Sequence, residues 1–301
     1  MIRANVFASF PIFSNGIRIE LPFSTDSSTI IFILLNPEYM SCNYLWLSDL
    51  HVDRLAPSAI NSLIGRILAA NSDGIWITGD IGEPPTNWNF LKALAAQCRV
   101  PIYFVLGNHD YYGQSIEISR VHANDISTLY SHVHYLTLQT PILLKNHVLL
   151  IGMDAWANTG EVGLTQLTWD SEAIIDLKAN NRTLLKSIMN DLAEQDANLL
   201  LAKCRQGITQ NITEVRVLTH IPPFIPPTDL ALPKPLQQNR SVFYSCALNR
   251  AITILNDEYP HIYFYFHSGH VHRLLTYKID GTQGKVIAAY TPDQPFVWEY
   301  V

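Results

Sequence analysis

Three short apolar segments alternate with two helical segments near the front of the chain. The apolar segments, residues 43–48, 74–78 and 102–106, are rich in β-branched and aromatic residues, as strands buried on both faces are. Between them, residues 57–70 carry apolar side chains on one helical stripe, and residues 87–98 also have a helical pattern. This order predicts parallel strands joined by right-handed crossovers, and therefore an α/β sheet.

Each of these three predicted strands ends in polar side chains. In chain order they are Asp49 and His51, then Asp80, then Asn108, His109 and Asp110. A single strand end of this kind could be a surface turn, because Asp and Asn are common turn residues. The carboxyl ends of neighbouring parallel strands, however, lie side by side at the sheet edge where open α/β sheets place their active sites. The sequence therefore predicts that these side chains gather in one place.

Histidines follow two more predicted strands later in the chain. Residues 214–218 lead to His220, and residues 261–266 lead to His270 and His272. The last two histidines are two positions apart, so in an extended segment both side chains point the same way. Together with the earlier strand ends they make a mixed oxygen and nitrogen ligand set. Such a set suits Mn, Fe or Zn rather than Ca or Mg alone.

Taken in order, these strand ends resemble the signature of the calcineurin-like metallophosphoesterase superfamily. That signature consists of D-x-H, then GD, then GNH followed by D or E, then a separate H, and finally GH-x-H. The chain has all of these blocks in this order, spread over about residues 44–275. The resemblance implies an α/β (α+β) fold of the metallo-dependent phosphatase type, a four-layered αββα sandwich with two mixed sheets.

Carried over to this chain, the resemblance implies two bound divalent metal ions, with Mn, Fe and Zn as candidates. Asp80 would bridge the two ions. The first ion would also be bound by Asp49, His51 and His272, and the second by Asn108, His220 and His270.

The resemblance also implies a reaction. A hydroxide that bridges the metals would attack phosphorus in line, and His109 would donate a proton to the leaving alkoxide. Some family members hold this histidine with an Asp three residues after the bridging Asp, where this chain has Glu83. Three further residues near the blocks are candidates for supporting the site or contacting the substrate: Asp110, Arg54 and His267.

The implied function is metal-dependent hydrolysis of a small phosphomonoester or phosphodiester. Many phosphoprotein phosphatases have an arginine before the GNH block, and the Leu106 at this position disfavours phosphoprotein substrates. The surroundings of the GD and GNHD blocks look more like the uncharacterised bacterial phosphohydrolase branch.

Two other functions are alternatives: a metal-dependent nuclease, and a non-catalytic scaffold that keeps the fold. The net charge of −6 and the pI near 6.0 argue against nucleic acid as a partner. A scaffold should lack ligand residues, and here every one is present.

Outside the blocks, the sequence predicts a single domain over residues 1–301. Residues 1–43 are expected to form an N-terminal β extension, and residues 170–212 a helical insertion or cap. Substrate choice is expected to depend on the proline-rich loop 221–237 and on residues 154–212. The sequence also predicts a strand at 148–153 and helices at 115–130 and 244–256. Three antiparallel strands, at 274–279, 284–289 and 296–301, are expected to close the fold.

The cysteines and the start of the chain bear on its location. The four cysteines are far apart, and no long apolar run follows Met1. These features predict a cytoplasmic protein without a membrane anchor. They leave the oligomeric state open.

Overall fold

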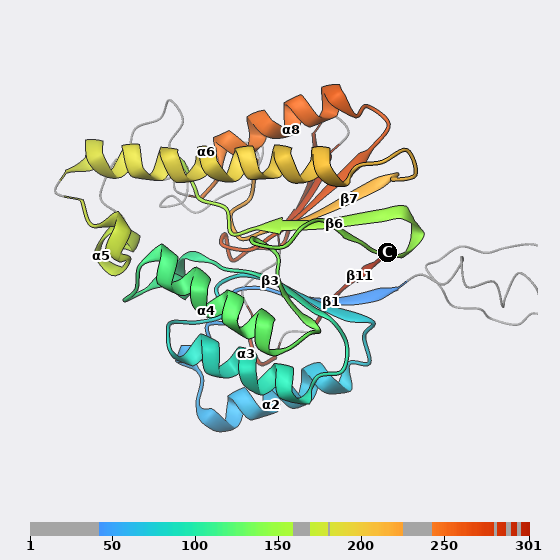
Figure 1. Cartoon of the computed structure of the whole chain (residues 1–301). Coiled ribbons are helices and arrows are strands. Elements are labelled where there is room, and N and C mark those ends of the chain that lie inside the picture. The colour runs from blue at the N-terminus through green and yellow to red at the C-terminus, as the bar shows by residue number, and fades with distance from the viewer. Residues whose placement is uncertain are drawn as a thin grey trace, which may run out of the picture. The chain divides into compact units, whose positions relative to one another are not determined.

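The computed structural model describes residues 42–158, 169–179, 181–224, 243–279, 282–286, 290–293 and 296–301. Within them, two mixed β-sheets lie against each other, and helices cover the outer side of each sheet (Figure 1). The predicted αββα sandwich is thereby confirmed. The predicted N-terminal β extension lies outside the described residues apart from residues 42 and 43, as does most of the proline-rich loop. The single domain over the whole chain stays a prediction.

The first sheet contains the three strands predicted at the front of the chain. β1 (Asn43–Leu47), β2 (Gly74–Thr78) and β3 (Ile102–Val105) are parallel neighbours, so their carboxyl ends lie side by side as expected. Two strands that flank them complete the order β11-β1-β2-β3-β4: β4 (Val133–Tyr135), which is parallel to β3, and β11 (Val297–Tyr300), which is antiparallel to β1. β4 was not predicted, because a strand of three residues carries almost no periodic signal.

Helices α2 (Pro57–Ala69), α3 (Thr86–Gln97) and α4 (Ile116–Leu129) cover the outer face of the first sheet (Figure 1). Local sequence signals start two of them. α2 has proline at its first position, where the missing N–H has no intrahelical partner to lose. α4 is capped by Ser115, whose hydroxyl oxygen accepts a hydrogen bond from the backbone N–H of Ile118.

The second sheet is built around three more parallel strands. They are β6 (Val148–Met153), β7 (Glu214–Thr219) and β8 (Tyr263–Ser268). The full order is β5-β6-β7-β8-β10-β9, with β5 (Ile142–Leu143) and β9 (Leu275–Ile279) at the edges and β10 (Thr282–Val286) between β8 and β9.

The closing strands differ in part from the expectation. β9 is antiparallel to β10 and β11 to β1, but β10 also runs parallel to β8. The reason is that the second strand of the β9–β10 hairpin lies on the inner side, next to β8. β8 itself begins at Tyr263, two residues later than predicted.

Two helices cover the second sheet (Figure 1): α6 (Arg182–Gly207) and α8 (Cys246–Glu258). The long helical region predicted from residue 170 onward is divided into α5 (Asp170–Ala173), the short 3-10 helix η5 (Ile175–Leu177) and then α6. Among the described residues, no helix is long and apolar enough to cross a membrane.

Alternating side chains of the strands separate two apolar layers. In β1, Tyr44 and Trp46 belong to the layer between the sheets, whereas Leu45 and Leu47 face the helices. Leu45 lies opposite Ile75 of β2. The inter-sheet layer also includes aromatic residues of β2 and β3, which makes the two sheets one rigid support for their strand ends.

Candidate metal centre

The five sequence blocks converge at the carboxyl ends of the strands of both sheets. β1, β2 and β3 supply the residues from the first sheet, and β7 and β8 supply the histidines from the second. The contact between sheets is direct, because Nε2 of His272 lies 3.1 Å from Oδ1 of Asp49. The structure therefore brings together the predicted metal ligands and the predicted proton donor: Asp49, His51, Asp80, Asn108, His109, His220, His270 and His272.

One cluster consists of Asp49, His51, Asp80 and His272, whose donor atoms all lie within 4.8 Å of one another. The two imidazoles point their Nε2 atoms at each other, 3.3 Å apart. Oδ2 of Asp80 lies 3.8 Å from Nε2 of His51. Two carboxylates and two imidazoles that converge in this way can hold one divalent cation.

A second cluster shares Asp80 and adds His220 and His270, again within 4.8 Å. Here it is Oδ1 of Asp80 that approaches Nε2 of His220, at 3.3 Å. Oδ1 of Asn108 lies 3.2 Å from the same nitrogen and 3.1 Å from Nδ1 of His270. The two oxygens of Asp80 thus face two different groups of ligand atoms, an arrangement that suits a carboxylate bridging two metals.

The electrostatics of the site favour positive charge at its centre. Burial opposes the ionisation of both Asp49 and Asp80, yet the pKa of each carboxyl is lowered. The hydrogen bond that Asp49 accepts from His272 lowers the pKa of Asp49, and the charge of His220 lowers that of Asp80. Burial also works to lower the pKa of His220, yet the Asp80 carboxylate raises it to about 10. Buried carboxylates of this kind need a cation, and the donor set fits divalent transition metals.

The backbone at the site is held in an unusual conformation. Five of the ligand candidates have positive φ values, between 42° and 67°: Asp49, His51, Asp80, His270 and His272. For residues with a side chain this region costs on the order of 1–3 kcal/mol each. Such strain persists only where the surrounding structure imposes it, and it is concentrated here at the strand ends that carry the donor atoms.

Two glycines of the sequence blocks have no side chain where the carboxylates of Asp80 and Asp49 lie against their backbone. A Cβ atom on Gly107 would lie 2.2 Å from Oδ1 of Asp80, and one on Gly269 would lie 2.3 Å from Oδ2 of Asp49. Any larger residue would therefore displace a carboxylate. This close approach gives a physical reason for glycine in the GNHD and GH-x-H blocks.

His109 lies beside the clusters. Its Nε2 is 4.0 Å from Oδ2 of Asp80, its ring meets that of His51 edge-on at 4.7 Å, and 17% of its side chain is exposed. Its Nδ1 lies 3.6 Å from Oε1 of Glu83, too long for a hydrogen bond but close enough for an ionic contact. Glu83 thus lies where the resemblance places the carboxylate that holds this histidine.

The other three candidates lie in different settings. Asp110 is buried and accepts hydrogen bonds from the backbone N–H groups of Gly107, Ile81 and Gly82 and from the side chain of Asn87, so it ties the second and third strand ends together. Burial raises its pKa to about 7. Arg54 is 55% exposed at its side chain and lies 3.8 Å from Asp53.

His267 does not reach the site. Its ring is fully buried between the sheets, 4.9 Å from the ring of Trp46 and 5.0 Å from that of Trp76, and 3.4 Å from Glu299. The expectation that it supports the site or contacts substrate is corrected accordingly. The physical reason is the alternation of side chains along β8, which turns this position toward the other sheet.

Sequence reasoning considered Asp154 only as a possible substrate contact and did not predict that it supports two strand ends. Asp154, at the end of β6, is buried and accepts a hydrogen bond from the backbone N–H of Leu106, just before the GNHD block. Its backbone carbonyl accepts one from the N–H of His220. The sequence indicates only that Asp154 ends a predicted strand. The structure adds that its carboxylate points toward the backbone of Leu106.

The site opens into a cleft of about 420 Å³. Its lining includes five of the predicted residues, and three residues outside the predicted set: Phe243, Val271 and Arg273. The size lies within the range of small-molecule sites. Arg273 directly follows the last block, so the cleft combines the ligand candidates with one basic and one aromatic side chain.

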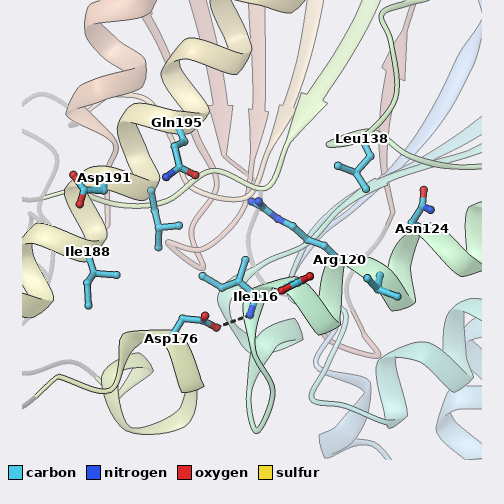
Figure 2. A pocket seen from close by; sticks show the side chains of 11 residues that line it. Ile116, Arg120, Asn124, Leu138, Asp176, Ile188, Asp191 and Gln195 are labelled. Carbon is cyan, nitrogen blue, oxygen red and sulfur yellow. Dashed lines mark hydrogen bonds between the residues drawn. The ribbon is translucent and has the colours of Figure 1, made fainter.

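A second cavity, of about 670 Å³, lies between α4 and α6 (Figure 2). None of the ligand candidates lines it. Among its described lining residues the basic one is Arg120, which is paired through Nε with the Asp154 carboxylate at 3.1 Å. The cavity is therefore apart from the metal centre.

A known protein family matches the chain in sequence, and solved structures match it in fold. The profile of the calcineurin-like phosphoesterase family matches residues 43–274. Phosphopantetheinyl hydrolase from Mycobacterium tuberculosis is similar in structure, with a TM-score of 0.51, 12% identity, and coverage of 82% of this chain and 89% of that one. A dimetal phosphatase from Danio rerio has a TM-score of 0.52, 12% identity, and coverage of 82% and 88%. At this identity the likeness concerns the fold. No curated protein matches the chain in sequence.

Proposed function

The chain belongs to the calcineurin-like phosphoesterase family, and from its metal centre we propose that it is a dimetal-dependent hydrolase of small phosphate esters. The observation that carries this proposal is the position of the Asp80 carboxylate between the two clusters. Its Oδ2 faces the ligand atoms of one cluster and its Oδ1 faces those of the other. A site for a single ion would not need two clusters that share one carboxylate. The Danio rerio protein of similar fold is named a dimetal phosphatase, in agreement with this inference.

The ligand sets follow from the two clusters. Asp49, His51 and His272 would hold the first ion and Asn108, His220 and His270 the second, with Asp80 between them. Two divalent cations bound there would supply Lewis-acid activation of the ester and of a water molecule. Mn, Fe and Zn all suit this mixture of carboxylate, amide and imidazole donors.

His109 is the residue best placed to give a proton to the leaving group. It borders the Asp80 carboxylate, it is partly open to the cleft, and it is not a member of either cluster. Glu83 would orient the imidazole through its contact with Nδ1, which leaves Nε2 on the side of the cleft. The proton would pass from Nε2 to the ester oxygen as the bond to phosphorus breaks.

The cleft supports a small substrate. Arg273 offers a positive charge for phosphate oxygens, and the Phe243 ring, which lies 5.3 Å from the His270 ring, offers an apolar surface to the alcohol part of the ester. Both phosphomonoesters and phosphodiesters fit these features. The net charge of −6 weighs against a nucleic acid substrate.

The cysteines support a reducing location such as the cytoplasm. All four are free thiols, and three of them are buried. Free thiols are the usual state of cysteines in a reducing compartment.

Hydrolysis of two simple esters tests the proposal. Purified protein with Mn²⁺ should hydrolyse an aryl phosphate or a bis-aryl phosphate, and a chelator should abolish the activity. Asp80→Asn should do the same, whereas Asp125→Asn, which alters an exposed acid of α4, should leave the rate unchanged. Inactivity on both esters, or equal activity in Asp80→Asn, would contradict the proposal. Metal-dependent nicking of DNA in their place would favour a nuclease.

A further inference from the structure

The Asn108 side chain is held from outside the five blocks. Its Nδ2 donates a hydrogen bond to Oδ1 of Asp170, at 2.9 Å, and lies 3.3 Å from the hydroxyl oxygen of Tyr112. The Tyr112 hydroxyl in turn donates to the same oxygen of Asp170, at 2.6 Å. One carboxylate oxygen thus accepts from both side chains.

These contacts decide which way the Asn108 amide points. An amide has one oxygen and one NH₂ group, and rotation by half a turn exchanges them with little change in shape. With the NH₂ group directed at Asp170, Oδ1 is directed at the opposite side, where it lies 3.2 Å from Nε2 of His220 and 3.1 Å from Nδ1 of His270. In the reverse orientation the NH₂ group would face those nitrogens, and a cation would find no oxygen.

The segment that carries Asp170 is fastened to the loop after the GNHD block. The backbone N–H of Gly113 donates to the carbonyl of Ala173, and the N–H of Ile175 donates to the carbonyl of Gln114. Asp170 is therefore held in place independently of its own contact with Asn108. A fixed acceptor can select one orientation of the amide before any metal arrives.

We propose that Asp170 is a positioning residue that presents the Asn108 oxygen to the second metal and thereby sets the affinity of that site. This inference rests on the proposed dimetal function. The hydrogen bond, rather than the negative charge, is the part of Asp170 that matters. Asp170→Asn keeps an acceptor oxygen at the same place without the charge, whereas Asp170→Ala and the similarly sized Asp170→Leu remove the acceptor.

Titration of the full-length, metal-stripped protein with Mn²⁺ tests the proposal, with calorimetry for affinity and elemental analysis for stoichiometry. The wild type should bind two ions. Asp170→Ala and Asp170→Leu should bind the first normally and the second about 10- to 100-fold more weakly. Asp170→Asn should stay close to the wild type. Glu172→Ala, which changes an exposed acid of the same short helix, is the matched control and should have no effect.

Electron paramagnetic resonance gives a readout that a merely structural role would not move. At two equivalents of Mn²⁺, the wild type and Asp170→Asn should show an exchange-coupled pair, and Asp170→Ala should show isolated ions. Circular dichroism of the metal-stripped proteins identifies a variant that fails to fold. If one of the two acceptor-free variants fails, the other still tests the proposal.

The outcomes separate this inference from the function on which it rests. A wild type that binds no Mn²⁺ overturns the dimetal proposal itself. A wild type that binds two ions, with unchanged second-site affinity in both folded acceptor-free variants, overturns only the role of Asp170. A loss in Asp170→Asn as large as in Asp170→Ala overturns positioning by the hydrogen bond and points to the charge.

Discussion

At the scale of single residues, His109 and Asp110 show how neighbouring side chains divide their tasks. They are consecutive in the chain, yet His109 borders the cleft and Asp110 is buried with four hydrogen-bond donors around it. The sequence placed both at the same strand end, and only the family resemblance gave them different expected roles, His109 as proton donor and Asp110 as a residue that supports the site or contacts the substrate. In the short 3-10 helix η3 (Asn108–Tyr111), one side chain faces the cleft and the other is buried between the strand ends, which agrees with the proposed division into chemistry and support.

The proposed role of His109 as proton donor predicts a dependence on the leaving group. In His109→Gln, hydrolysis of an alkyl phosphate should slow by about 100- to 10,000-fold, because an alkoxide needs a proton to leave. A nitrophenyl ester should slow far less, since nitrophenolate leaves unprotonated. Steady-state rates on a series of esters with graded leaving groups measure this, and an equal loss across the series would show that His109 acts in another way.

At the scale of elements, the parallel strands were predictable and their partners across the molecule were not. β1, β2 and β3 follow from short β-branched and aromatic runs separated by helical ones, and their neighbouring ends follow from topology. The contact between Asn108 and Asp170 joins positions 62 residues apart through a helix of four residues. No periodicity or spacing reports such a contact, because it depends on how two loops pack.

The close approach of the β8 and β1 ends predicts the effect of a single methyl group. A Cβ atom on Gly269 would lie 2.0 Å from Oγ of Ser48 and 2.3 Å from Oδ2 of Asp49. Gly269→Ala should therefore push the two ends apart, lower the free energy of unfolding by about 1–3 kcal/mol and weaken Mn²⁺ binding. Denaturant unfolding and metal titration measure the two effects.

Gly65→Ala is the matched control for this substitution. Gly65 lies within α2, and a Cβ atom there would meet nothing within 4 Å. The variant should be stabilised by about 0.5–1 kcal/mol, because alanine favours helix more than glycine does, and its metal binding should be unchanged. If Gly269→Ala behaved like this control, the strand ends would not be as tightly packed as described.

At the scale of the whole molecule, α6 carries buried ionisable side chains, and these make the stability of the fold depend on pH. Burial raises the pKa of Asp196 from its ordinary 3.8 to about 7, near Arg120, Asp154 and Lys203. A raised acid pKa means that the folded state favours the protonated form. The stabilisation is fully present below the unfolded pKa of about 3.8 and is lost as the pH rises through about 7.

Asp196→Asn should therefore lose less stability than the wild type when the pH rises. Between pH 5 and pH 8 the free energy of unfolding of the wild type should fall by about 2–3 kcal/mol relative to the variant. Denaturant unfolding of both proteins at the two pH values gives this difference directly, because contributions from other groups cancel. Equal pH dependence in the two proteins would mean that Asp196 is ionised in the fold at neutral pH.

The central claim for the molecule is that its two sheets together form one centre for two metals. Anomalous diffraction from crystals grown with Mn²⁺ tests this claim most directly. Two peaks about 3.5–4 Å apart are expected, one beside Asp49, His51 and His272 and the other beside Asn108, His220 and His270, with Asp80 between them. A single peak at saturating Mn²⁺, or no peak among these side chains, would contradict it.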